Sequence, residues 1–135
     1  MQIKNIQSVE NLFMLAQKIH EFLTMEVHTD DIEVAVCRGH ELAAYMASTG
    51  KALADAKYWK DKAVKDSILY QMKDSKVMGL PASVLNELIK AENKELNYLA
   101  TWFERLDREC THQLDWMRSI VSKMKEEYKI TAYQS

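Results

Sequence analysis

The amino-acid sequence predicts an all-α protein, in which a short N-terminal helix precedes a long antiparallel helical hairpin with coiled-coil-like packing, completed by self-association. The 135 residues include only three glycines and one proline, which leaves few of the turns that β-sheets need. Apolar residues make up 47% of the chain, enough for one buried core in a single domain. They recur at steps of three and four residues, the period of an amphipathic helix.

The first helix is predicted over residues 8–25. Ser8 is a suitable N-cap, and the apolar residues that follow it share one helical face. Those residues are Val9, Leu12, Phe13, Ala16, Ile19 and Leu23. The pattern fades at Glu26, and Asp30 followed by Glu33 has the spacing of a capping box, so we expect a second helix to begin at about residue 30.

The second helix is predicted over residues 30–74, because no proline interrupts this stretch and its apolar residues keep a helical period. The main apolar stripe consists of Ile32, Val36, Gly39, Ala43, Met46, Gly50 and Leu53. At about 1.5 Å per residue such a helix is ~65 Å long. Gly79 suits a helix C-terminus and Pro81 the start of the next helix, which predicts the turn of a hairpin between them.

The third helix is predicted over residues 81–128, where apolar residues follow an almost strict 4-3 spacing typical of a coiled-coil seam. The seam consists of Leu85, Ile89, Glu92, Leu96, Leu99, Phe103, Leu106, Cys110, Leu114, Met117, Val121, Met124 and Tyr128. Glu92 is its one charged member. If the hairpin folds about the Gly79–Pro81 turn, the numbers of facing residues add to about 156.

Both long helices carry a second apolar set beside the main seam, which predicts a homo-oligomer. On the second helix this set is Tyr45, Ala52, Ala56, Trp59, Ala63 and Tyr70, and on the third it includes Tyr98, Trp102 and Trp116. The first helix is too short to cover all of it. We therefore expect an interface at Trp59, Tyr70, Tyr98 and Trp102. In the alternative interpretation, these aromatic residues flank a wide three-helix core.

Charge and hydropathy exclude some partners. The net charge of −2 comes from 18 basic and 20 acidic residues mixed along the chain, which argues against duplex nucleic acid. No run of eighteen apolar residues and no signal-peptide pattern is visible, so we expect no membrane partner and a cytoplasmic protein. Cys37 and Cys110 are too few for a disulfide framework and are expected to be free thiols.

Catalytic and metal motifs are not found in the sequence. Glu109 and His112 form one Glu-x-x-His step, whereas di-iron bundles need two. Cys110 and His112 are two residues apart and point about 200° away from each other on a helix, so they do not share a tetrahedral ion. No phosphate loop or nucleophile motif occurs. We expect no enzyme, no metal and no cofactor, and a metal-dependent enzyme ranks as the third alternative.

One cluster of residues favours an anionic ligand. Arg105, Arg108 and His112 share a helical face with Trp116 one turn further on, and the hairpin brings Lys51 and Tyr45 to the same level. Guanidinium groups bind phosphates and aromatic rings stack on bases. The predicted ligand site is therefore Lys51, Tyr45, Arg105, Arg108, His112 and Trp116. In the alternative, Glu104, Asp107 and Glu109 pair with the arginines and leave an ordinary charged surface.

Two segments resemble short helical proteins encoded by phages and mobile elements of gut bacteria: Ala52–Tyr58, with the sequence ALADAKY, and Cys110–Leu114, with the sequence CTHQL. The resemblance covers the two long helices and implies a setting, and no functional residue is carried over from it. In architecture the chain is also similar to oligomeric helical proteins with which phages sequester nucleotide second messengers of host defence.

Together these observations lead us to expect a non-enzymatic, self-assembling binding protein for a nucleotide-type ligand. The alternative is a protein-interaction module, such as an inhibitor or assembly factor that acts on a host protein through exposed aromatic helix faces.

Overall fold

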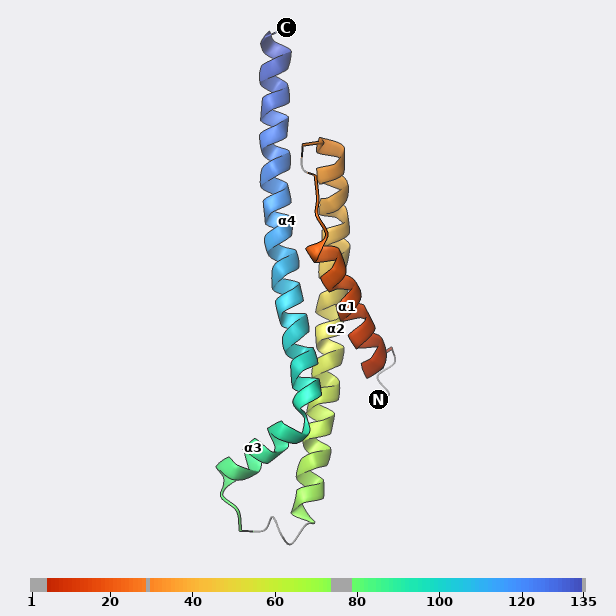
Figure 1. Cartoon of the computed structure of the whole chain (residues 1–135), viewed down its shortest axis with the longest axis vertical. Coiled ribbons are helices and arrows are strands. Elements are labelled where there is room, and N and C mark those ends of the chain that lie inside the picture. Colours follow the sequence, from red (N-terminus) through yellow and green to blue (C-terminus); the bar gives the residue numbers. More distant parts are fainter. Residues whose placement is uncertain (1–4, 29, 74–78, 135) are drawn as a thin grey trace.

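The structure, a computed structural model, describes residues 5–28, 30–73 and 79–134. Within these ranges all regular secondary structure is helical: α1 (Val9–Thr24), α2 (Ile32–Met72), α3 (Ala82–Glu92) and α4 (Lys94–Gln134). The long helices α2 and α4 run antiparallel side by side, and α1 packs against both (Figure 1). The predicted architecture of a short helix followed by a long helical hairpin is confirmed.

The helix boundaries follow local capping chemistry. The hydroxyl of Ser8 accepts a hydrogen bond from the backbone N–H of Asn11 at 3.2 Å, as an N-cap does at the start of α1. At the start of α2 the N-cap is Asp31 rather than the predicted Asp30, and its carboxylate accepts from the N–H of Glu33 at 2.9 Å. The predicted end of this helix at residue 74 lies outside the described residues.

The core lies where α1, α2 and α4 meet. The predicted seam on α4 is confirmed over its middle part, where six consecutive members are buried: Leu99, Phe103, Leu106, Cys110, Leu114 and Met117. From α1 the core receives Leu12, Ala16, Ile19, Phe22 and Leu23. Fully burying a large apolar side chain stabilises a fold by about 1.5–3 kcal/mol, so this shared core holds the three helices together.

The register of the hairpin agrees with the prediction. The hydroxyl of Thr49 on α2 donates to the carboxylate of Asp107 on α4 at 2.7 Å, and these numbers add to the predicted 156. One turn earlier on α2, the sulfur of Met46 accepts from the hydroxyl of Thr111 at 3.4 Å. Thr49 and Met46 of α2 therefore face Asp107 and Thr111 of α4, at the predicted level.

The predicted stripe on α2 is not the buried row. The residues buried there are Ala35, Arg38, Leu42, Thr49, Ala52, Asp55, Ala56 and Gln71, whereas Ala43 and Gly50 of the predicted stripe are exposed. Helix α1 covers the flank of α2 that carries the second apolar set, and this moves the buried face toward Ala52 and Ala56. Periodicity does not choose between two adjacent apolar faces, because the third helix decides which one is covered.

The predicted third helix over residues 81–128 is two helices, broken at Asn93. The side-chain amide of Asn93 donates to the carbonyl of Ile89 at 2.9 Å and to the hydroxyl of Ser67 at 3.2 Å, while its backbone leaves the helical conformation. Helix α3 therefore bends away from the hairpin (Figure 1). Asn93 is buried and Glu92, the predicted charged seam member, is exposed.

Two polar side chains hold the C-terminal end of α1. The guanidinium of Arg38 donates to the carbonyl of Phe22 at 2.8 Å, and its carbon lies 3.7 Å from the centre of the Phe22 ring. The amide of Gln113 donates to the carbonyl of Leu23 at 2.9 Å, and its oxygen accepts from Arg38 at 3.2 Å. The last carbonyls of a helix lack partners within it, so these bonds complete the end of α1. Burial lowers the pKa of Arg38, and the carboxylate of Glu41 opposes that shift.

The last turns of α4 extend beyond the start of α2, and this helix continues to Gln134 rather than ending at the predicted residue 128 (Figure 1). Large apolar side chains exposed on this extension are Tyr128, Ile130 and Tyr133. Among the helices of the described residues, none is long and apolar enough to cross a membrane.

Candidate ligand-binding groove

A groove with a volume of about 570 Å³ lies between α1 and α4, and we call it the α1–α4 groove. Small-molecule sites in proteins commonly have volumes of about 300–1,000 Å³. Its lining residues are His20, Leu23 and Thr24 of α1 and Tyr98, Thr101, Trp102, Arg105, Leu106 and Glu109 of α4. The groove therefore combines aromatic rings, hydroxyl groups and two opposite charges.

Three aromatic rings meet in the groove around Trp102. The His20 ring lies 6.2 Å from the Trp102 ring, centre to centre, in an edge-on arrangement with an interplanar angle of 66°. The Tyr98 ring lies 5.8 Å from Trp102 at 56°. Aromatic pairs favour such tilted geometries, which hold Trp102 between two helices. Tyr98 remains largely exposed, so the cluster offers a ring surface to a ligand.

The guanidinium of Arg105 makes no ion pair or hydrogen bond with another of the described residues. The acidic residues nearest in sequence have other contacts. Asp107 accepts from Thr49, Glu104 lies 3.9 Å from Lys57, and Glu109 accepts from Gln113 at 3.1 Å. Among the described residues, none of these three acids pairs with Arg105 or Arg108, in contrast to the alternative interpretation of the sequence. Arg105 keeps its N–H donors for a ligand.

The structure divides the predicted ligand site. Arg108 and His112 line a separate, shallower hollow of about 400 Å³, whereas Arg105 lines the α1–α4 groove. The other residues of this hollow are Leu53, Glu104, Asp107 and Thr111, so acids adjoin its two basic groups. Trp116 is 64% exposed and lines neither space. Of the six predicted ligand-binding residues, only Arg105 lies in the groove.

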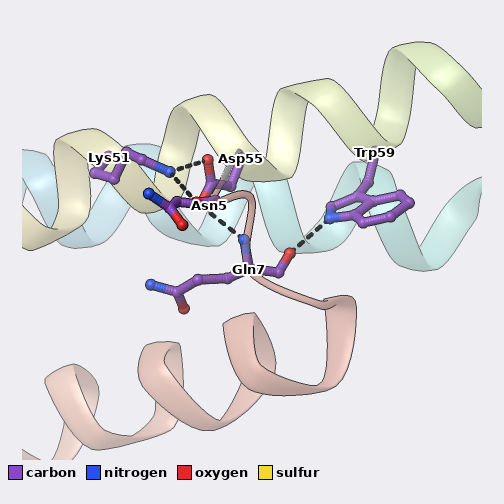
Figure 2. A network of polar contacts seen from close by, with 5 residues as sticks. All are labelled: Asn5, Gln7, Lys51, Asp55 and Trp59. Carbon is purple, nitrogen blue, oxygen red and sulfur yellow. Dashed lines mark hydrogen bonds and ion pairs between the residues drawn. The ribbon is translucent and has the colours of Figure 1, made fainter. Parts of the chain in front are cut away.

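Lys51 is not brought to the arginines. Its ammonium lies 2.5 Å from the carboxylate of Asp55 and 3.0 Å from the carbonyl of Asn5 (Figure 2). Thr49 faces α4, and a side chain two residues further along a helix points about 200° away from it. The hairpin register therefore places Lys51 at the predicted level but turns it toward the N-terminal segment.

Two side chains of α2 bind the N-terminal segment through hydrogen bonds to the backbone N–H and the carbonyl of Gln7. The carboxylate of Asp55, which is 4% exposed, accepts from the N–H of Gln7 at 3.2 Å. The indole N–H of Trp59 donates to the carbonyl of Gln7 at 2.7 Å (Figure 2). Trp59, predicted to lie in an interface between copies, thus makes a contact within the chain.

The remaining predicted residues are placed as follows. The Tyr45 ring packs on Phe22 with its centre 4.5 Å away, so Tyr45 belongs to the α1–α2 contact and not to a ligand surface. Tyr70 is exposed near the end of α2. Tyr98 and Trp102, predicted as interface residues, line the α1–α4 groove together with Arg105.

Sequence reasoning missed the contribution of α1 to the groove. His20 and Thr24 lie one turn apart on this helix, but no sequence pattern indicates which part of α4 they approach. Only the docking of α1 places them opposite Tyr98 and Trp102. A signal was present for α4 alone, because Tyr98, Trp102, Arg105 and Glu109 recur at helical steps on one face.

The two cysteines are free, and they differ in exposure and in reactivity. Cys37 is exposed and Cys110 is buried, and both are free thiols. Burial raises the pKa of Cys110 to about 11, with further contributions from the carboxylates of Asp107 and Glu109. Cys110 is therefore protonated and unreactive near neutral pH. In the part of the chain that the structure describes, no group of three or more His, Cys, Asp or Glu residues is placed to hold a metal ion.

No protein-family model, no curated protein and no solved structure matches this chain.

Proposed function

We propose that the chain is a non-enzymatic helical binding protein that takes a nucleotide-type anionic ligand in the α1–α4 groove. The observation that carries this proposal is the unpaired guanidinium of Arg105 beside the aromatic cluster of Trp102, Tyr98 and His20. Arginine binds phosphate oxygens through paired N–H donors, and aromatic side chains stack on bases. A groove that presents both groups suits a ligand with a ring and a phosphate.

As part of the same proposal, we assign the protein to the cytoplasm, where its two free cysteines remain reduced. The resemblance to phage and mobile-element proteins supplies the biological setting. There the protein sequesters a nucleotide signal of host defence and needs no catalytic group to do so.

Replacing Arg105 by alanine is expected to weaken ligand binding by about 10- to 100-fold, because a hydrogen bond to a charged group contributes about 1.5–3 kcal/mol. The measurement is calorimetric titration with mononucleotides, dinucleotides and cyclic nucleotides. The melting temperature should stay unchanged, since an exposed arginine without an ion pair contributes little to folding.

The matched control is Arg118→Ala, which removes an exposed arginine of α4 that lies outside the groove and 3.6 Å from Asp115. This variant should bind like the unmodified protein. If no nucleotide binds the unmodified chain, or if Arg105→Ala unfolds it, the proposal is wrong.

We also propose that the chain self-associates, and the observation that favours this is the apolar surface at the end of α4. The 4-3 seam that packs against α2 continues through Met124 to Tyr128, past the start of α2. Tyr133 near the end of this extension is 91% exposed. Because this surface continues an existing helix–helix interface, we propose that a second copy of the chain covers it.

Light scattering at micromolar concentration tests this second proposal. We expect a mass of about twice 15.7 kDa. Tyr128→Glu should shift the mass to that of one chain, since a charge in the centre of an apolar interface costs association energy. Arg105→Ala, which lies far along α4 from this surface, should leave the mass unchanged. A monomeric unmodified protein would overturn this second proposal.

A further inference from the structure

We infer that the α1–α4 groove selects a flat ring bearing one singly charged anionic group and an N–H donor, and that it rejects ligands with two or more negative charges. This inference rests on the proposed function and specifies its ligand. It follows from the two opposite charges on the groove wall, Arg105 and Glu109.

Arg105 and Glu109 lie four residues apart on α4, so they are separated by one helical turn, or about 6 Å along the axis. Both line the groove, and no ion pair joins them among the described residues. One carboxylate oxygen of Glu109 accepts from the amide of Gln113 at 3.1 Å. That amide also donates to the carbonyl of Leu23 at 2.9 Å, which fixes the carboxylate at this position.

The charge balance of the wall limits the charge of the ligand. Arg105 compensates one negative charge of a ligand. Glu109 lies about 6 Å along the helix axis from Arg105, which is closer than the ~8–10 Å beyond which salt screens charge interactions. A phosphate monoester carries about −1.5 to −2 at neutral pH, so its second charge meets the carboxylate without a cation to offset it. A cyclic phosphodiester and a carboxylate each carry one charge. The groove therefore favours these singly charged groups over open monophosphates and diphosphates.

The carboxylate of Glu109 also favours a ligand that carries a donor, because it accepts from Gln113 through one oxygen and has acceptor capacity left. The exocyclic amine of a nucleobase supplies such a donor, and so does the ammonium group of an amino acid. In both cases the ring packs against Trp102, between His20 and Tyr98. A base-bearing cyclic monophosphate and an aromatic amino acid thus share the chemistry that the groove recognises.

The test is calorimetric titration of the full chain with adenosine 3′,5′-cyclic monophosphate, adenosine 5′-monophosphate, adenosine and tryptophan. The first three share base and ribose and differ in charge. We expect the cyclic monophosphate to bind at least about tenfold more tightly than the open monophosphate, and adenosine to bind more weakly than the cyclic form. Tryptophan binding more tightly than the cyclic monophosphate would support the selection of a singly charged ring compound, but it would show that the nucleotide-type ligand of the proposed function is wrong.

Glu109→Gln removes the repelling charge and keeps the shape of the side chain. In this variant the open monophosphate should gain at least about tenfold in affinity and close the gap to the cyclic form. Glu126→Gln, which changes an exposed glutamate of α4 outside the groove, should alter neither affinity. If the unmodified protein binds the open monophosphate as tightly as the cyclic one, this inference is overturned while the proposed function stands. If no nucleotide binds the unmodified protein, the proposed function itself fails.

Discussion

Replacing Phe103 by alanine is expected to lower the free energy of unfolding by about 3–5 kcal/mol, the range for removing a fully buried phenylalanine. Phe103 is completely buried in the core where α1, α2 and α4 meet. The substitution removes the apolar contacts of the ring and leaves a cavity that the long, stiff helices close only in part. Chemical denaturation followed by circular dichroism measures the change as a shift of the midpoint at constant slope.

Two comparisons make this result specific to burial. Phe103→Leu should cost less than Phe103→Ala, because most of the apolar volume is kept. Met14→Ala, at an exposed apolar residue of α1, should change the stability by less than about 0.5 kcal/mol. Equal midpoints for Phe103→Ala and the unmodified protein would show that α4 packs through a different face.

Arg38→Ala is expected to lower the free energy of unfolding by about 2–3 kcal/mol, the range for a lost hydrogen bond to a charged donor together with a lost cation–π contact. Arg38 is 5% exposed and joins the carbonyl of Phe22 to the amide oxygen of Gln113. Without it, the C-terminal end of α1 loses a partner that no other described side chain supplies to this carbonyl. The measurement is again the denaturation midpoint.

Arg38→Met separates the packing of this side chain from its charge. The buried Nε of Arg38 has no hydrogen-bond partner among the described residues, and burial lowers the pKa of the guanidinium, so the charge itself is costly in this environment. A flexible methionine refills the space over Phe22 without that cost, and we expect it to lose less stability than alanine. If alanine and methionine are equally destabilising, the hydrogen bonds to α1 outweigh packing. If neither changes the midpoint, Arg38 does not hold the end of α1.

The fold class, the hairpin and its register could be predicted from the amino-acid sequence. The 4-3 spacing on α4 identified the buried row from Leu99 to Met117, and the position of the turn identified the pairing of Thr49 with Asp107. These features depend on the helical period and on chain connectivity, which are properties of neighbouring residues. The clustering of Tyr98, Trp102 and Arg105 on one face of α4 was visible for the same reason.

The break at Asn93 could not be predicted from the sequence. Asparagine has only a modestly poor helix propensity, so the apolar pattern predicts an uninterrupted helix through this position. At the break, the buried amide of Asn93 bonds to the carbonyl of Ile89 and to Ser67 of α2, a partner across the hairpin that no local sequence pattern indicates. A contact across the hairpin thus overrides a weak local preference.

The candidate site also depended on tertiary structure, through the docking of α1. From the sequence, either a third helix or another copy of the chain could cover the second apolar set of α2. In the structure, α1 packs on Tyr45 and the N-terminal segment bonds to Trp59. The same docking brings His20 to Trp102. Lys51 meanwhile faces Asp55 and Asn5. A helical period specifies which residues share a face. Packing between segments distant in the chain determines which segment covers that face, and here the packing of α1 on α4 forms the groove.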